Sequence, residues 1–377
     1  MSSISVNTIT DASGGSTTSI NGYTPSASNM TGRNRIINGD MRIDQRNTGA
    51  STSVSAGATF YGVDRFAGFF GASATGCTTQ QASTAPAGFI NSFKFAVGTG
   101  ASSSSGQTAW IGQRIEGLNV ADLGWGTANA KTVTLSFYVY ASATGTYCVF
   151  LTNSAGDRSY VATYTISSAN TWEQKTITIA GDTSGTWLTT NGIGVSVRWD
   201  LGSGSSYNTA TTSAWQAGDY RNTSSQVNVI GTSSATFYIT GVQLEEGSVA
   251  TPFEHRQYGQ ELALCQRYYY VLSAASNQNT FFSSTSGYTS TQALCVIPFS
   301  NTMRTNPSLV TSGTASDYRL IMGGSFLTCS SVPTMDQPNP NSANLIFTVS
   351  SGIVVGYGGQ ALANNTTSAF LGFSAEL

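Results

Sequence analysis

Residues 131–141 read KTVTLSFYVYA, and this run decides the fold class. Apolar side chains occupy every second position, at Val133, Leu135, Phe137 and Val139, while Thr, Ser and Tyr fill the positions between them. Such alternation is typical of a β-strand with one face in a core and the other face toward solvent.

Runs of the same kind follow along the chain, and each ends in Gly, Asn, Ser or Asp, the residue types that favour turns. They lie at 145–153, 160–166, 172–181, 191–202 and 235–247. Strands at this spacing predict an all-β domain built as a two-sheet antiparallel sandwich.

One segment has a helical rather than a strand pattern, FEHRQYGQELALCQRYYYVL at 253–272, and it predicts a short helix near 257–271. Four of its residues recur at spacings of four, three and four, which places them along one side of a helix as a packing strip. This strip consists of Tyr258, Leu262, Cys265 and Tyr269. After Leu272 the β pattern returns and predicts a second, smaller β-domain.

The sequence therefore predicts four parts: an N-terminal arm over 1–33, a sandwich domain over 34–256, a helical connector over 257–272 and a C-terminal β-domain over 273–377. The arm consists of short β-like runs separated by Ser, Gly and Thr, which cannot build a core. It is expected to be an extended segment that orders against another surface, with a flexible tail as the alternative.

Composition excludes several classes of partner. Only 9% of the residues are charged, against about 25% in typical domains, and the net charge is −2 without any basic run. Nucleic acid and anionic membranes are therefore not expected partners.

The first residues have neither a basic nor an apolar signal region, and no stretch approaches about 18 apolar residues. We therefore expect synthesis in a cytoplasm and no membrane insertion.

The five cysteines are far apart in the sequence and show no C-x-x-C spacing. Such a scattered, odd-numbered set favours free buried thiols over disulfides or a zinc site. The set is Cys77, Cys148, Cys265, Cys295 and Cys329.

The residues give little sign of catalysis. His255 is the only histidine, it lies between Glu254 and Arg256, and no G-x-S-x-G or phosphate-binding glycine motif is present. We therefore predict no enzyme and no catalytic residue, with His255 as a surface or junction side chain. A bound Ca²⁺ is only weakly indicated, since no run has EF-hand spacing, and the prediction is no metal and no cofactor.

Charge is concentrated in NRIINGDMRIDQRN, residues 34–47. Asp40, Arg42, Asp44 and Arg46 alternate in sign at every second position, so on a strand one face would carry a ladder of opposite charges. We interpret the ladder as the closure of a sheet edge or of a subunit seam. An acid/base pair of Asp40 and Asp44 is the alternative, but carboxylates flanked by arginines are more often ion-paired.

The long Gly/Ser/Thr-rich segment 199–226 is the main candidate for binding, because loops of this length are usually functional. Aromatic faces can cover the C–H side of a sugar ring while carboxylates and guanidinium groups bind its hydroxyls. The glycan-binding candidates are Trp199, Asp200, Tyr207, Trp215, Asp219, Tyr220 and Arg221. Alternatively, Trp215 and Tyr220 close the end of the sandwich or a seam between subunits.

Several motifs occur in a fixed order along the chain. They are NRIINGDMRIDQRN (34–47), QRIEG (113–117), AWQAGDYR (214–221) and ATFYITGVQLEEGSVATPFEHRQYGQELALCQRYY (235–269). Together they resemble a module of bacteriophage tail-fibre and related virion appendage proteins, over about Asn34 to Tyr270. The resemblance implies a jelly-roll sandwich similar to carbohydrate-binding domains.

The resemblance further implies a homotrimer whose N-terminal arm attaches to other virion tail, collar or baseplate proteins. We therefore expect a structural protein of the virion that contributes to host attachment through surface glycans and is made in the cytoplasm of a host bacterium. One alternative is a purely structural collar, head or baseplate fibre. A polysaccharide depolymerase is another, but it would require clustered carboxylates in a groove.

Overall fold

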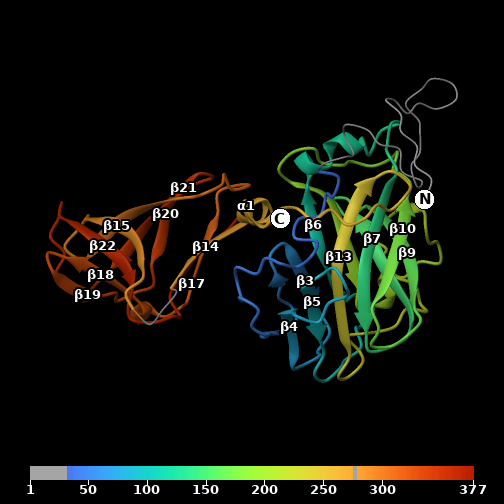
Figure 1. Ribbon diagram of the computed structural model, residues 1–377, viewed down its shortest axis with the longest axis horizontal. Coiled ribbons are helices and arrows are strands. Elements are labelled where there is room, and N and C mark those ends of the chain that lie inside the picture. The colour runs from blue at the N-terminus through green and yellow to red at the C-terminus, as the bar shows by residue number, and fades with distance from the viewer. Residues whose placement is uncertain (1–31, 275–277) are drawn as a thin grey trace, which may run out of the picture. The chain divides into compact units, whose positions relative to one another are not determined.

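The computed structural model describes residues 32–274 and 278–377 (Figure 1). These residues form 23 strands, one α-helix and four short 3-10 helices, so the all-β fold predicted from the sequence is confirmed. The predicted N-terminal arm lies outside the described residues, apart from Gly32 and Arg33.

The chain divides into two compact units, and the division is not contiguous in sequence. Among the described residues, the first unit contains 32–42, Gly49–Gly62 and Phe66–His255, while the second contains those of Arg256–Leu377 together with Ile43–Thr48 and Val63–Arg65. The sequence predicted an uninterrupted domain over 34–256, and it gave no sign that two short N-terminal segments group with the C-terminal part.

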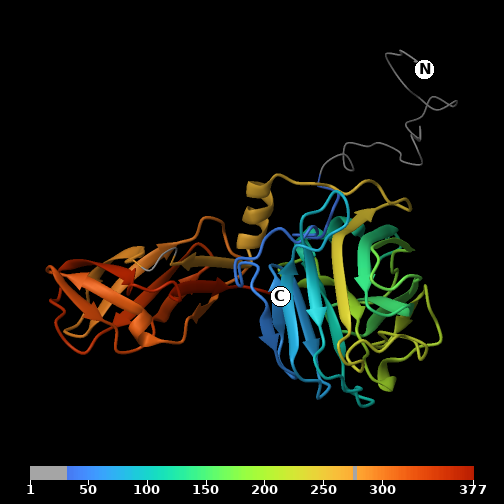
Figure 2. The ribbon, with the colours of Figure 1, turned by 60° about the horizontal axis from the view of Figure 1, so that its bottom comes forward.

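The first unit is a sandwich of two antiparallel sheets (Figure 2). The sheet that we call the β13 sheet runs in the order β1 (Thr52–Val54), β4 (Cys77–Ala82), β5 (Ser92–Ala96), β13 (Thr236–Glu246), β7 (Val133–Ala141) and β10 (Glu173–Ile179). The β11 sheet runs in the order β12 (Trp215–Ala217), β9 (Arg158–Ile166), β8 (Gly145–Thr152), β11 (Ile193–Asp200), β6 (Ala109–Glu116), β3 (Phe66–Phe70) and β2 (Phe60–Val63).

The strand order identifies the sandwich as a jelly roll. We number β5, β6, β7, β8, β9, β10, β11 and β13 from one to eight in chain order. The central strands of the β13 sheet are then 1-8-3-6 and those of the β11 sheet are 2-7-4-5. This is the order that results when two Greek keys wrap into facing four-stranded sheets.

Alternating residues of the central strands fill the sandwich. Leu135, Phe137 and Val139 of β7 are all 0% exposed, as the pattern of 131–141 predicts, and Val197 and Trp199 of β11 are buried equally well. The rings of Phe137 and Trp199 meet edge to face with centroids 5.2 Å apart. Burial of such rings is a large hydrophobic contribution to stability.

The second unit is also built from two antiparallel sheets. Its smaller sheet runs in the order β14 (Tyr269–Ser273), β23 (Phe370–Ser374) and β17 (Ser308–Thr311). Its larger sheet runs in the order β19 (Ser325–Thr328), β18 (Tyr318–Met322), β22 (Gly358–Ala363), β15 (Phe281–Gly287), β16 (Gln292–Pro298), β21 (Ser342–Thr348) and β20 (Thr334–Asn339).

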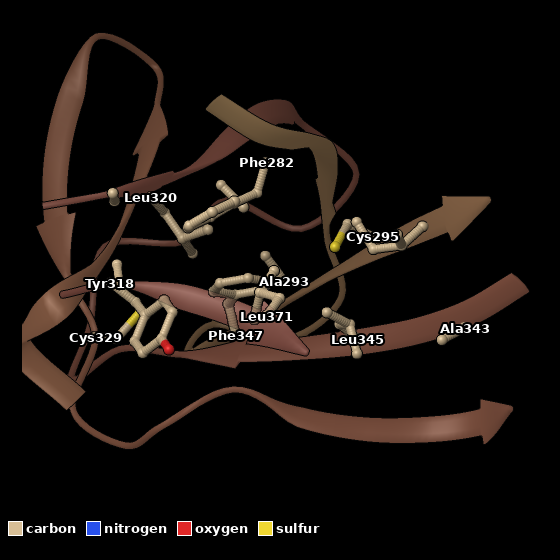
Figure 3. Close-up of a cluster of buried hydrophobic side chains, with 14 of the residues drawn as sticks. Phe282, Ala293, Cys295, Tyr318, Leu320, Cys329, Ala343, Leu345, Phe347 and Leu371 are labelled. Atoms are coloured by element: carbon tan, nitrogen blue, oxygen red, sulfur yellow. The ribbon is translucent and has the colours of Figure 1, made fainter. Parts of the chain in front are cut away.

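The core of the second unit is apolar and lies between these strands, with Phe347, Leu345 and Leu320 each 0% exposed (Figure 3). Cys295 and Cys329 belong to the same cluster. All five cysteines of the chain are buried free thiols, which confirms the prediction from their spacing.

The charge ladder predicted for residues 40–46 is not present. None of these residues lies in a strand, and Asn38 and Met41 have positive φ angles of 59°, which breaks the alternation that a ladder requires. Asp40 instead forms an ion pair with Arg42 in the first unit. Asp44 accepts a hydrogen bond from the backbone N–H of Asn47 at 3.0 Å.

Arg46 belongs to an ion-pair network of the second unit. It lies 3.2 Å from Glu376 and 3.7 Å from Asp64, and its guanidinium is stacked 3.6 Å above the ring of Tyr269. Arg65 forms an ion pair with the same Glu376 carboxylate. The two arginines thus connect the short N-terminal segments of this unit to its C-terminal end.

The predicted helix is shorter than expected, and its packing strip is wrong. Helix α1 (Tyr258–Gln266) ends before Tyr269, which lies in strand β14, and Tyr258 is 57% exposed. Glu261 and Cys265 are its buried residues. The buried Glu261 is compensated by Arg256, whose Nη1 lies 3.2 Å from its carboxylate, so this side of the helix packs through an ion pair as well as apolar contacts.

Candidate functional site

The structure separates the seven predicted glycan-binding residues into three groups. Trp199 and Asp200 lie at the end of β11 and are 0% and 1% exposed, so neither can contact a ligand at the surface. That part of the prediction is wrong. Trp199 packs in the core because it occupies an inward-facing position of the strand, which the loop-like sequence after it obscured.

Asp200 organises the loop that follows it. Its Oδ1 accepts hydrogen bonds from the backbone N–H groups of Gly202 at 2.8 Å and Ser203 at 2.9 Å, and from the side-chain amides of Asn222 and Gln226. Burial raises the pKa of this carboxyl above its usual range, while these hydrogen bonds oppose the rise. The residue fixes the loop conformation.

The second group lies along the outer face of the β11 sheet. Arg221 forms a bidentate pair with Asp219, with N–O distances of 2.9 and 2.6 Å, and its guanidinium is 4.0 Å from the centre of the Tyr207 ring. The backbone N–H of Tyr220 donates to Ser159 Oγ of β9 at 3.1 Å, which holds this part of the loop on the sheet. Tyr207, Tyr220 and Arg221 are half-buried.

Trp215 forms the third group, together with two other tryptophans. Its ring centroid is 5.3 Å from that of Trp125 and 5.1 Å from that of Trp187, and these two are 4.8 Å apart. Its indole N–H donates to the backbone carbonyl of Ala180 at 2.7 Å. This arrangement fits the alternative hypothesis that Trp215 packs against the sandwich and closes one part of it.

Replacing Trp215 by alanine is therefore expected to lower the free energy of unfolding by about 2 kcal/mol, because a half-buried ring that packs against two others is removed. The affinity for surface polysaccharides is expected to change by less than about twofold, which corresponds to less than about 0.4 kcal/mol of binding free energy. Calorimetry and an array of bacterial polysaccharides measure the two effects. Unchanged melting together with lost binding would show that the ring is a ligand contact.

A polar pocket of about 200 Å³ lies in the folded loop region. Hydroxyl and amide side chains line it, among them Ser203, Asn208, Asn222 and Gln226. No aromatic ring borders this pocket. It therefore offers hydrogen bonds but no apolar surface for a ligand.

A larger pocket of about 510 Å³ lies over the outer face of the β13 sheet and combines rings with polar groups. Ser136 and Tyr138 face outward here, because their neighbours on β7 face the core. Its remaining lining comes from β10, β13 and the segment after β13: Gln174, Gly241, Ala250, Thr251, Pro252, Phe253 and His255, with Phe89 from the loop before β5.

Four rings stand together in this aromatic pocket. The centroid of Phe89 lies 5.4 Å from that of Tyr138, 5.2 Å from that of Phe253 and 5.5 Å from that of His255. Gly241, at φ +61°, makes this possible, since a Cβ there would lie 2.7 Å from the Phe89 ring and 2.9 Å from the Tyr138 ring. The volume and the mixed lining are those of a small-molecule site.

The segment Gly247–His255, which we call the strap, carries two of these rings and is held to the sheet by buried polar side chains. Glu245 of β13 accepts hydrogen bonds from the backbone N–H of Thr251 at 2.9 Å and from its hydroxyl at 2.6 Å. Gln243 accepts one from the backbone N–H of Glu254 at 2.8 Å. Because Gln243 and Glu245 are almost fully buried, the strap has a defined position and the pocket is preformed.

Sequence reasoning missed this pocket because its lining comes from five separate segments. One signal was available: Tyr138 and Tyr140 occupy outward-facing positions of a strand whose preceding outward-facing residues are Thr134 and Ser136. The strap residues Phe253 and His255 belong to the run 253–272 with the helical pattern, but they precede both the predicted helix near 257–271 and α1, which begins at Tyr258.

His255, the single histidine of the chain, lines the aromatic pocket. His255 is 53% exposed, and its Nδ1 lies 3.9 Å from a carboxylate of Asp40 that is already paired with Arg42. Within residues 32–274 and 278–377, no group of three or more His, Cys, Asp or Glu side chains could hold a metal ion. In the same part of the chain, no helix is long and apolar enough to cross a membrane.

The first unit is thus a jelly-roll sandwich with a ligand-sized aromatic pocket on its outer surface. Searches of protein-family profiles and of curated protein sequences found no match to the chain. Two solved structures that are similar to it differ greatly in the share of their own length that is covered.

One is the enzymatically active domain of tailspike protein 4 of bacteriophage CBA120, with a TM-score of 0.29 and 12% identity over 57% of this chain and 21% of that one. The chain thus spans about a fifth of the tailspike structure. The other is the family 11 carbohydrate-binding module of a cellulosomal cellulase of Clostridium thermocellum, with a TM-score of 0.28 and 14% identity over 55% of this chain and 98% of the module.

Proposed function

We propose that the protein is a non-catalytic part of a bacteriophage tail fibre or similar virion appendage, and that it binds glycans of the host surface. The aromatic pocket is the main observation that supports a role in glycan binding. Its rings offer apolar faces to the C–H side of a sugar, while Gln174, Ser136 and Thr251 offer hydrogen bonds to the hydroxyls. The volume of about 510 Å³ lies within the range of small-ligand sites.

The virion role is supported by the ordered motifs of residues 34–270 that resemble phage appendage proteins. The low charge and the abundance of Ser, Thr and Gly suit a durable extracellular structure with few sites for proteases that cleave after lysine. We assign attachment to other virion proteins to the N-terminal arm, as the resemblance implies.

Binding to an array of bacterial surface polysaccharides tests the glycan role. We expect the purified protein to bind a subset of the polysaccharides, and periodate oxidation of the vicinal hydroxyls to abolish that binding. If the protein binds none of them, or binds the oxidised ones equally well, the glycan role is excluded and a purely structural role in the particle is favoured.

We further propose that the protein is a homotrimer. The second unit leaves many large apolar side chains exposed, and some of them gather in two loops joined by hydrogen bonds between Gly287 and Tyr357 and between Gly356 and Gly287. Tyr288, Val354, Val355 and Tyr357 are each at least 47% exposed. Such a cluster is typical of a surface that another protein copy covers.

Sedimentation equilibrium tests the assembly. Since one chain has a mass of 39.3 kDa, we expect about three times this mass at micromolar concentration. A single-chain mass under these conditions would contradict the trimer.

A further inference from the structure

Arg198 occupies an unusual position at the centre of the β11 sheet. Its neighbours in β11, Val197 and Trp199, point into the core, so the arginine side chain points to the outer face. The strand register places it beside Gly112 of β6 and Phe150 of β8. A Cβ at Gly112 would lie 3.0 Å from Arg198 Cγ, so the glycine leaves room for the arginine stem.

Aromatic rings surround the guanidinium group. Its carbon lies 4.4 Å from the centre of the Trp110 ring and 6.0 Å from that of Phe150, both of which are buried. Cation–π contacts of this kind hold the side chain in one orientation. They do not supply a hydrogen-bond acceptor for its N–H groups.

Within the described residues, the Nε of Arg198 is buried and has no hydrogen-bond partner, while the side chain as a whole is half-buried. The charged groups close to it are Arg114 of β6, Arg221 of the loop and Asp219. Asp219 forms a bidentate pair with Arg221, and Asp200, two residues along β11, accepts hydrogen bonds from its own loop. Neither carboxylate is therefore available to compensate Arg198.

The surroundings disfavour the charge of Arg198. Burial and the positive charges of Arg114 and Arg221 lower its pKa to about 9. A half-buried cation without a carboxylate partner is partly desolvated, and this lowers the stability of the fold. A bound anion would remove the penalty, and the planar guanidinium matches carboxylate and phosphate groups in a bidentate manner.

We propose that Arg198 is the central residue of an oxyanion-binding site on the outer face of the β11 sheet. The site takes a carboxylate or phosphate group of an acidic polysaccharide, with Arg221 and the half-buried ring of Tyr207 that Arg221 stacks on beside it. This proposal rests on the proposed glycan-binding function but concerns the opposite sheet from the aromatic pocket. An anion site there selects acidic glycans, a chemical class that the aromatic pocket alone does not select.

Calorimetric titration with oligogalacturonate, its carboxyl-reduced form and inorganic phosphate tests the proposal. We expect the unmodified protein to bind oligogalacturonate or phosphate and not to bind the carboxyl-reduced form at this site. Binding to oligogalacturonate alone identifies a carboxylate ligand, and binding to phosphate alone identifies a phosphate ligand. If it binds neither anion, the proposal is overturned.

Arg198→Met keeps most of the apolar stem and removes the charge. It is expected to weaken anion binding by about tenfold or more, the loss that follows when charged hydrogen bonds are removed. The melting temperature is expected to stay equal or rise, because a half-buried charge without a carboxylate partner disappears. A lower melting temperature with unchanged anion affinity would instead show a structural role and overturn the proposal.

Arg319→Met is the matched control, since Arg319 also lies over an aromatic ring, 4.6 Å from the centre of Phe326, but in the second unit. It is expected to leave anion affinity unchanged. An equal loss in both variants would show that net charge, and not the site, controls binding. Periodate-sensitive binding to neutral polysaccharides by Arg198→Met would leave the glycan-binding function intact even if the anion site failed.

Discussion

Glu376→Ala is expected to lower the free energy of unfolding of the second unit by about 3–5 kcal/mol. The Glu376 side chain is 7% exposed and compensates two arginines, Arg46 at 15% and Arg65 at 2% side-chain exposure. Its removal leaves both guanidinium groups in a buried environment without this carboxylate. Breaking a buried ion pair from one side has an effect of this size, because the remaining charge loses its partner but stays desolvated.

The distribution of tryptophan makes this measurement specific to one unit. All six tryptophans belong to the first unit, so tryptophan fluorescence follows its unfolding while calorimetry follows both. We expect Glu376→Ala to lower the midpoint temperature of the calorimetric transition that tryptophan fluorescence does not detect, which is that of the second unit. Glu246→Ala is the control, since the pair of Glu246 and Lys131 is exposed and should contribute at most about 1 kcal/mol. Equal effects of the two variants would contradict the importance of the buried network.

Tyr138→Ala and Phe253→Ala are each expected to weaken binding to the polysaccharides that the array identifies by about tenfold. Each variant removes one ring of the aromatic pocket, and the loss of an aromatic contact with its buried area amounts to about 1–2 kcal/mol. The melting temperature of the first unit should fall only slightly, because both rings are half-buried. Affinity is measured by titration with an oligosaccharide from the bound polysaccharide.

Tyr140→Ala is the matched control for these variants. Tyr140 lies two residues from Tyr138 on the same strand and the same face of the sheet, where it packs against Trp172 and Tyr238 outside the pocket. We expect it to keep full affinity. Unchanged affinity in Tyr138→Ala and Phe253→Ala, or an equal loss in Tyr140→Ala, would place the sugar elsewhere.

The fold was largely predictable from local sequence pattern, for a physical reason. Strand side chains alternate between core and solvent, so the run 131–141 specifies both the element and its buried face without information from the rest of the chain. The charged stretch that contains Arg46 was not predictable in this way. Its alternation resembles a strand, but the partner that decides its conformation, Glu376, is 330 residues away in the sequence.

The candidate site was predictable only in part. The segment 199–226 did prove to hold Arg221, Asp219 and Tyr207 together at the surface, but the same segment contains the buried end of a strand and a ring packed against other tryptophans. The aromatic pocket depends on contacts between distant segments and on the position of the strap. Composition and spacing cannot reveal such contacts. The buried Gln243 and Glu245 explain the position of the strap once the fold is known.

A crystal structure with an oligosaccharide from the bound polysaccharide tests most directly whether the aromatic pocket binds sugar. We expect electron density for a sugar ring against Phe253 and Tyr138, with the sugar hydroxyls within hydrogen-bond distance of Gln174. Density for the sugar elsewhere on the protein, with the pocket empty, would contradict this expectation.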